Sequence, residues 1–245
     1  MHLRRSAVPA GRTLARTGVL AASLVLAAHG MAAATAPQDP VRPAVPPDLA
    51  RPERPAIRSG PEPLDLTAPI PYFIAPGQAE DGTRPGDLEL ARWALEAWAR
   101  ALGPSVRLVS AREPDAVIRL YWAGPQGGQY GEMRGIVVNG RRGAAVYIRP
   151  DTSSLGPDIA ALTKADPLLR DVVVHLTCVH ELGHAFGLTH TRDFRDIMYS
   201  FVFGGDLEEY FGRYRRRLRT RADIARTSAM SDGDLARLQA LYPQP

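Results

Sequence analysis

The sequence contains a single cysteine, Cys178, and a single lysine, Lys164. One cysteine excludes an intramolecular disulfide, and we interpret Cys178 as a small buried apolar residue. The scarcity of lysine reflects a compositional preference for arginine, which supplies nearly all of the 30 basic residues. With 45% hydrophobic residues among 245, the chain has enough apolar content for one globular domain with extensions.

Long apolar runs are also scarce. The run from Gly18 to Ala28 follows four arginines and precedes small residues at 32–34 that match a signal-peptidase site. It is short for a permanent bilayer-spanning helix, so we predict a secretory signal peptide over residues 1–34, with a retained anchor as the alternative. The mature protein is then expected to have no permanent membrane span and to be secreted or to lie in the cell envelope or periplasm.

Without this signal the sequence has no excess of basic charge. The formal net charge falls from +4 to 0, because residues 1–34 contain four arginines and no acidic residue. A neutral domain gives no electrostatic reason to bind nucleic acid. Residues 35–63 are rich in proline and arginine and poor in large apolar residues, which indicates an extended linker or a short prosegment. The globular, catalytic domain is therefore predicted over residues 64–245.

Only six histidines occur in the chain, and three of them form the pattern H-E-x-x-H-x-x-G-x-x-H from His180 to His190. Residues four apart share one face of a helix, so His180 and His184 can bind the same ion. Gly187 can adopt a positive φ, end the helix and return His190 towards that ion. Three neutral imidazoles leave a fourth position open, which is typical of a catalytic zinc site.

Glu181 is rotated about 100° around the helix from His180, which suits it to act on the attacking water rather than on the metal. It is therefore the expected general base. His175 points to another face of the helix and is predicted to be either structural or on the surface. Because His175 and Cys178 cannot complete a second tetrahedral set, we expect one zinc ion per domain. Calcium on oxygen ligands stays compatible with the sequence but is not indicated.

The extended motif, followed eight positions after His190 by Met198, resembles the metzincin metallopeptidases with their Met-turn. Three features resemble the matrixin branch, of a bacterial, secreted type. They are the short spacing between His190 and Met198, Gly183 inside the motif, and the hydroxyl residue Thr191 after the third histidine. The chain departs from the matrixin pattern at Thr191, where Ser is usual, and at Ser200, where Pro is usual.

This resemblance implies an α+β fold, with a mixed twisted sheet and the active-site helix in the N-terminal half and the Met-turn and a C-terminal helix in a smaller lower half. It also implies a zinc-dependent endopeptidase, a monomer by default, that cleaves protein or peptide substrates. Met198 becomes a hydrophobic floor beneath the ligands rather than a ligand. The residues that follow it, Ser200, Phe201 and Val202, are expected to line the pocket for the side chain after the scissile bond, which their apolar character predicts to be apolar.

Local patterns predict the elements of this fold. Strands are expected at residues 70–75, 106–110, 116–122, 133–138 and 144–148. Helices are expected at residues 87–102, 167–188 and 231–242. The turn signal Asn139-Gly140 predicts a hairpin between the last two strands, and Asp166 is expected to cap the zinc helix. Gly135 to Val138 is either the cleft-lining edge strand that the resemblance implies or an ordinary interior strand.

Roughly thirty residues separate Tyr199 from the last helix, which is more than in matrixins. A helix that begins after Asp206 is predicted there, and arginines gather near its end, at positions 213, 215, 216, 217, 219 and 221. They form either a solvated helix face or a docking surface for an anionic substrate or envelope polymer.

Two other functions fit parts of the pattern. A different zincin could use an acidic third ligand, Glu208 or Glu209, although His190 makes this unnecessary. A non-catalytic envelope-binding module could keep the zinc scaffold, although the intact Glu181 argues against it. Matrixin zymogens are held latent by a prosegment cysteine on the zinc, and this chain has no cysteine before Cys178.

Overall fold

The computed structural model describes residues 62–124 and 130–243, all within one compact unit. The predicted signal peptide and all but the last two residues of the predicted linker lie outside the described residues. In the described part, no helix has the length and apolar character needed to span a membrane.

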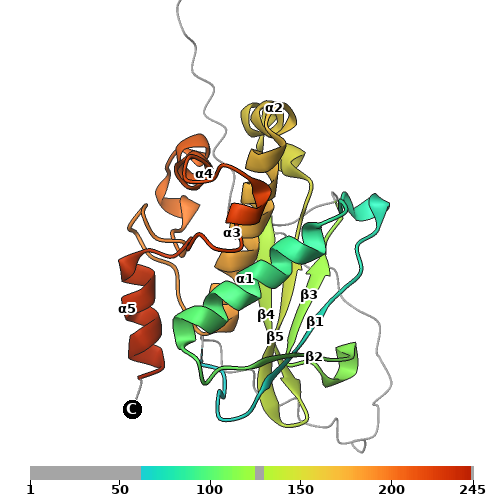
Figure 1. Ribbon diagram of the computed structural model, residues 1–245, viewed down its shortest axis with the longest axis vertical. Helices are drawn as coiled ribbons and strands as arrows, with labels where there is room; N and C mark the ends of the chain where they lie inside the picture. Colours follow the sequence, from blue (N-terminus) through green and yellow to red (C-terminus); the bar gives the residue numbers. More distant parts are fainter. Residues whose placement is uncertain (1–61, 125–129, 244–245) are drawn as a thin grey trace, which may run out of the picture. The chain divides into compact units, whose positions relative to one another are not determined.

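A five-stranded mixed sheet forms one layer of the domain, in the order β2-β1-β3-β5-β4 (Figure 1). The strands are β1 (Ile70–Ile74), β2 (Leu108–Ser110), β3 (Ile118–Trp122), β4 (Gly131–Val138) and β5 (Arg141–Ile148). All neighbours are parallel except β4 and β5, which form the predicted hairpin with Asn139 and Gly140 at φ 51° and 77° in the turn. The segment Gly135 to Val138 therefore lies on an antiparallel edge strand, not in the interior of the sheet.

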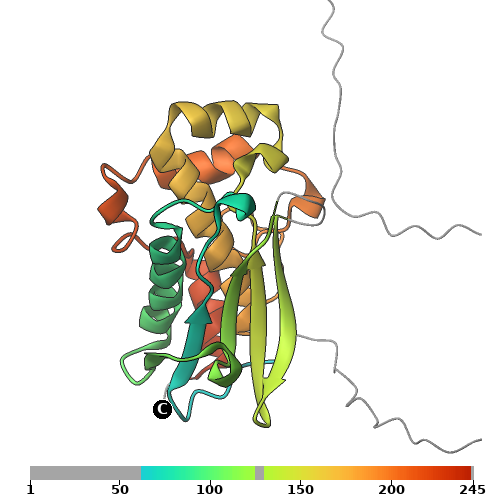
Figure 2. The ribbon, with the colours of Figure 1, turned by 90° about the vertical axis from the view of Figure 1, so that its right-hand side faces the viewer.

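Two long helices, α1 (Asp87–Leu102) and α3 (Pro167–Ala185), pack on one face of this sheet (Figure 2). The apolar positions predicted for α1 are almost all buried, because their spacing forms one stripe that faces α3 and the sheet. Trp98 on α1 donates its indole N–H to the carbonyl of Val179 on α3 at 2.8 Å. This bond ties the two helices together in the core beneath the motif.

The structure corrects the predicted helices in two places. A short helix, α2 (Pro157–Ala165), precedes α3 and was not predicted. The helix α3 begins at Pro167, capped by Asp166 as expected, but ends at Ala185 rather than near Leu188. It ends earlier because the chain already turns at Gly187, where φ is 95°.

Two further helices, α4 (Leu207–Arg215) and α5 (Asp232–Leu241), complete the C-terminal part. Asp206 caps α4, and Ser231 with Asp234 forms a capping box at the start of α5. Near the end of α5, the hydroxyl of Tyr242 accepts the N–H of Leu64 at 2.7 Å and donates to the carbonyl of Phe186 at 2.9 Å. Both ends of the domain thus meet at the end of the zinc helix.

Most arginines of the segment after the Met-turn bind other parts of the same domain. Arg215 lies 2.7 Å from the carboxylate of Asp166, and Arg221 lies 2.8 Å from that of Asp171 and also binds Glu89. Arg213 packs over aromatic rings, and Arg216 pairs with Glu209 within α4. These contacts hold the insertion against α1 and α3, so much of the cluster is already committed within the chain.

Candidate active site

The three predicted ligands converge on one point. The Nε2 atom of His190 lies 3.2 Å from Nε2 of His180 and 3.1 Å from Nε2 of His184. The Nδ1 atoms of His180 and His184 lie 2.6 Å and 2.8 Å from the carbonyl oxygens of Ile197 and Leu188. A carbonyl oxygen only accepts, so each Nδ1 carries the proton and each Nε2 keeps its lone pair.

This arrangement fits a zinc ion. Tetrahedral zinc with imidazole ligands spaces its nitrogens about 3.3 Å apart, close to the separations seen here. The Nε2 lone pairs of His180 and His184 both point towards Nε2 of His190, so the three nitrogens can share one cation. In the described part of the chain, His180, His184 and His190 are the one group of three or more His, Cys, Asp or Glu residues whose ligand atoms lie together.

Burial keeps these imidazoles neutral. Desolvation, followed by the neighbouring histidines, lowers the pKa of His180 to about 3, and burial also lowers the pKa of His184 and His190. Neutral rings with free Nε2 lone pairs are the form that binds a metal. The exposed position of His190 leaves this side of the site open to solvent.

Gly187 makes the return of His190 geometrically feasible. Its φ of 95° lies in the left-handed region, and the N–H of Leu188 reaches back to the carbonyl of Gly183 at 2.9 Å. A Cβ at Gly187 would also meet the backbone of Glu62 and Pro63 at 3.1–3.2 Å. The sequence predicted the turn, whereas the close approach of residues 62 and 63 depends on the tertiary fold.

Met198 packs directly beneath the zinc helix. It is fully buried, and a Cβ added at Gly183 would lie 2.4 Å from its sulfur and 3.0 Å from the ring of Trp98. The N–H of Thr191 binds the carbonyl of Met198 at 2.9 Å, so the turn closes onto the residue after His190. The side chain of Met198 thus lies against the helix that carries His180 and His184, and this contact explains why glycine stands at position 183.

Glu181 is on the zinc helix, and its side chain faces the start of the edge strand β4. Its side chain is 7% exposed, and burial, with a smaller contribution from Glu132, raises its pKa to about 8. A Cβ at Gly131 would lie 2.6 Å from Oε1 of Glu181. The sequence analysis did not identify Gly131, because only the fold brings β4 to this carboxyl group.

The predicted pocket residues divide into inward and outward side chains. Phe201 and Val202 lie in a short 3-10 turn, Phe201–Phe203, directly after the Met-turn, and Ser200 precedes this turn. Phe201 packs edge-on against Tyr199 and Tyr210, with ring centroids 5.4 Å and 4.9 Å away, whereas Val202 is 57% exposed. Ser200 is half-buried and donates its N–H to the carbonyl of Thr191. The free apolar surface at this turn therefore comes from Val202 and Phe203.

The other titratable residues near the motif are engaged elsewhere. Glu209 pairs with Arg216 at 2.6 Å, and neither Glu208 nor Glu209 joins the histidine group in the described residues. His175 is buried rather than on the surface, and its Nδ1 lies 3.1 Å from the carbonyl oxygen of Leu90. Cys178 is fully buried, as predicted.

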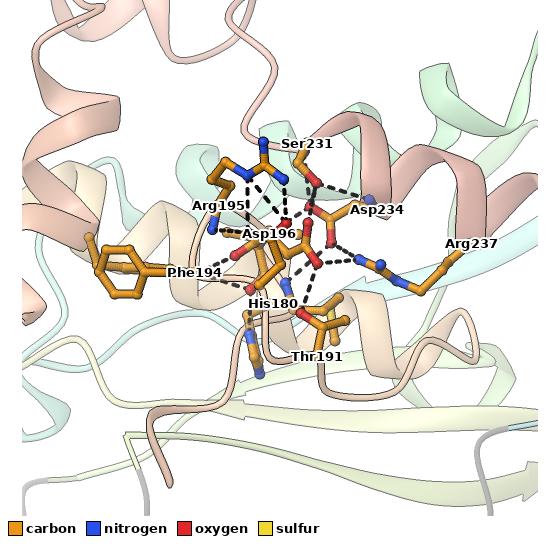
Figure 3. A network of polar contacts seen from close by, with 12 residues as sticks. His180, Thr191, Phe194, Arg195, Asp196, Ser231, Asp234 and Arg237 are labelled. Carbon is orange, nitrogen blue, oxygen red and sulfur yellow. Dashed lines mark hydrogen bonds and ion pairs between the residues drawn. The ribbon is translucent and has the colours of Figure 1, made fainter. Parts of the chain in front are cut away.

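A polar network joins the Met-turn to α5 (Figure 3). The carboxylate of Asp234, fully buried, accepts the N–H of Ile197 at 2.8 Å and the N–H of Ser231 at 2.9 Å. Asp196, 1% exposed, binds Ser231 and Arg237. Asp234 belongs to the capping box of α5, but its bond to the Met-turn spans 37 positions and could not be read from local pattern.

The chain is similar to one known protein family and to solved structures. The matrixin family model matches residues 89–209, which include the histidine triad and the Met-turn. Among solved structures, the chain is similar to an archaemetzincin from Methanopyrus kandleri, with 15% identity, a TM-score of 0.38 and coverage of 77% of this chain and 99% of that chain. It is also similar to myroilysin, with 13% identity, a TM-score of 0.36 and coverage of 77% of this chain and 98% of that chain. No curated protein matches the chain.

The family-model match and the three converging imidazoles support a zinc metallopeptidase domain that resembles the metzincins. Its α+β fold, with a mixed sheet and an active-site helix, is the fold that the sequence predicted. Within this class the domain is matrixin-like. The family implies a catalytic zinc ion, and the group His180, His184 and His190 could hold it.

Proposed function

We propose that this protein is a secreted, zinc-dependent endopeptidase with His180, His184 and His190 as metal ligands and Glu181 as the general base. One observation carries the proposal: a buried carboxyl group lies on the same helix as two of three imidazoles that converge on one point. The signal peptide predicted for residues 1–34 supports action outside the cytoplasm, in the medium or the cell envelope.

The chemistry divides between the metal and the protein. A zinc ion, when bound, polarises a carbonyl group and activates water. Glu181 takes a proton from the attacking water at its carboxylate oxygen and later passes one to the leaving amine. Burial raises the pKa of Glu181, so its carboxylate, once ionised, takes up a proton more readily than that of an exposed glutamate. Met198 supports the ligand-bearing helix from below and takes no proton.

The edge strand β4 is suited to hold the substrate backbone. Among the described residues it pairs only with β5, so the N–H and C=O groups along its other edge are free. An extended peptide can add to such an edge as a further strand. Since Gly131 at the start of β4 contacts Glu181, a peptide aligned on β4 would pass close to the base.

The turn after Met198 supports an apolar preference. Val202 and Phe203 are 57% and 48% exposed and follow the Met-turn directly. Exposed apolar side chains beside a catalytic site gain free energy when a substrate side chain covers them. We therefore expect the residue after the scissile bond to be apolar.

The test compares the mature chain, residues 35–245, with its Glu181→Gln variant. Both proteins should bind one equivalent of zinc, because the substitution removes no ligand. The variant should lose at least about 100-fold in kcat on peptides that the native chain cleaves, since the proton acceptor is gone. Substantial activity in Glu181→Gln would remove Glu181 from the mechanism. A zinc-loaded native chain that cleaved nothing in a broad peptide library would contradict the endopeptidase assignment and favour an envelope-binding module.

A further inference from the structure

Asp196 is a buried carboxylate with three donors from separate parts of the chain. Its side chain is 1% exposed. Oδ2 accepts the hydroxyl of Thr191 at 2.8 Å and a guanidinium N–H of Arg237 at 2.7 Å, and Oδ1 accepts the hydroxyl of Ser231 at 2.5 Å (Figure 3). One carboxylate thereby joins the segment after the third ligand to the first two turns of α5.

The position of Asp196 in the chain connects it to two of the three zinc ligands. Thr191 directly follows His190, so the Thr191 hydroxyl bond restrains the backbone that carries this imidazole. On its other side, Asp196 precedes Ile197, whose carbonyl oxygen accepts the Nδ1 proton of His180 at 2.6 Å. A change at Asp196 would therefore reach the ligand set from both ends of the loop.

The surroundings of Asp196 are shaped for a close approach of α5. A Cβ added at Gly233 would lie 2.9 Å from Oδ1 of Asp196, so the first turn of α5 reaches this carboxylate only because residue 233 is glycine. Asp193 in the same loop provides a contrast. Among the described residues its side chain bonds only to Arg195, two positions away, and the two side chains are 41% and 84% exposed. Exposed pairs of this kind contribute little, whereas charge-assisted bonds to a buried carboxylate are strong.

We propose that Asp196 is a positioning residue for the zinc site. Through Thr191 and through Ser231 and Arg237 on α5, it fixes the loop that carries His190 and the Ile197 carbonyl, and so sets the ligand geometry before the metal arrives. The C-terminal helix α5 thereby becomes part of the metal-binding machinery. This inference rests on the proposed zinc site, and its test separates the failure of one from the failure of the other.

The experiment measures zinc affinity in the mature chain by competition with a chromophoric chelator. Asp196→Asn keeps the shape but removes the charge, Thr191→Val removes the hydroxyl, and Thr191→Ser retains it. Asp193→Asn is the matched control.

Outer partners of metal ligands typically change affinity 10–100-fold, and we expect about tenfold weaker binding for Asp196→Asn and for Thr191→Val. The double variant Asp196→Asn/Thr191→Val should lose less zinc affinity than the product of the two single fold-losses, because both substitutions disrupt the same hydrogen bond. Thr191→Ser and Asp193→Asn should stay within about twofold of the native chain.

Two further readouts separate positioning from stability. The visible spectrum of the Co²⁺-substituted protein reports ligand geometry and should change in Asp196→Asn but not in Asp193→Asn. Thermal unfolding of the metal-free protein reports the purely structural contribution. A lower unfolding temperature with unchanged zinc affinity and Co²⁺ spectrum would overturn the proposal. If Asp196→Asn did not fold, equal zinc affinities in Thr191→Val and Thr191→Ser would overturn it instead. A native chain that bound no zinc would contradict the zinc site itself.

Discussion

The carbonyl oxygen of Ile197 lies 2.6 Å from Nδ1 of His180, so the residue before Met198 fixes the tautomer of the first zinc ligand. The N–H of the same residue is held by Asp234 at 2.8 Å. Ile197 thus transmits the placement of α5 to the imidazole through its two backbone groups. The Met-turn acts on the ligand helix through this hydrogen bond as well as through the packing of the Met198 side chain.

The contact between Gly131 and Glu181 predicts a separation of catalysis from metal binding. In Gly131→Ala the new Cβ would displace the Glu181 carboxyl group, from which it would be only 2.6–2.9 Å away. We expect zinc affinity and thermal stability to stay close to native, with kcat about 100-fold lower, because misplacement by about 1 Å costs this much. Gly135→Ala on the same strand is the control, since no atom lies within 4 Å of its new Cβ. Equal kcat values for the two variants would contradict the prediction.

The identity of the third ligand predicts opposite outcomes for two substitutions. His190→Ala should weaken zinc binding by several orders of magnitude, because it removes one of three converging Nε2 atoms. Glu209→Ala should leave zinc binding unchanged, since this carboxylate pairs with Arg216. Elemental analysis after dialysis against a weak chelator measures both. Zinc retained in His190→Ala and lost in Glu209→Ala would establish an acidic third ligand.

The buried imidazole of His175 predicts a pH dependence of stability. Burial lowers its pKa from 6.5 to about 4, so the folded state disfavours protonation relative to the unfolded state. The contribution of His175 is complete above pH 6.5 and is lost as the pH falls towards 4. Between pH 7.5 and pH 5 this loss amounts to about 2 kcal/mol.

His175→Gln removes the titration while its amide can still donate to the carbonyl of Leu90. Denaturant unfolding of both proteins at pH 7.5 and pH 5 should therefore show a smaller pH effect in His175→Gln. The other histidines titrate equally in the two proteins and cancel in the comparison. If both proteins lost the same stability between pH 7.5 and pH 5, His175 would take up no additional proton when the protein unfolds.

The exposed apolar turn predicts a cleavage preference that does not depend on salt. Val202→Ser should reduce the preference for apolar residues after the scissile bond about fivefold, from the loss of roughly 1 kcal/mol of apolar contact. Val109→Ser, on the opposite edge strand β2, changes a similarly exposed valine and serves as the control. Cleavage profiling at low and high ionic strength measures both effects.

The arginines of the insertion make the salt comparison informative. Arg215, Arg216 and Arg221 already bind acidic residues of the domain. An acidic preference at positions distant from the cut, strong at low salt and absent at high salt, would show that the remaining arginines reach the substrate. We expect no such preference from the three paired residues.

The sequence predicted those features that depend on residues close together in the chain. The spacing of His180, His184 and His190 follows from one helix and one glycine turn, and the cap at Asp166 follows from local hydrogen bonding. The five strands were found within three residues of their observed bounds, because apolar runs and the Asn139-Gly140 turn mark them.

Contacts between distant segments could not be predicted. Gly131 contacts Glu181 across 50 positions, and Asp234 binds Ile197 across 37, so each depends on how the sheet and helices pack. The helix α2 was missed because residues 157–165 carry a weak apolar stripe and are flanked by the turn-like pairs Gly156-Pro157 and Asp166-Pro167. The arginine cluster left two interpretations open, since its acidic partners lie on α1 and α3.

The hydroxyl of Tyr242 sets the limits within which this domain can be trimmed. It joins Leu64, near the first described residue, to Phe186, one position before the turn that leads to His190. If the predicted leader is removed, the cut must therefore fall before Leu64 for the N-terminal segment to stay attached to the zinc helix. A chain shortened at its C-terminus to before Tyr242 would lose this hydroxyl, and with it the hydrogen bond that holds Leu64 next to Phe186.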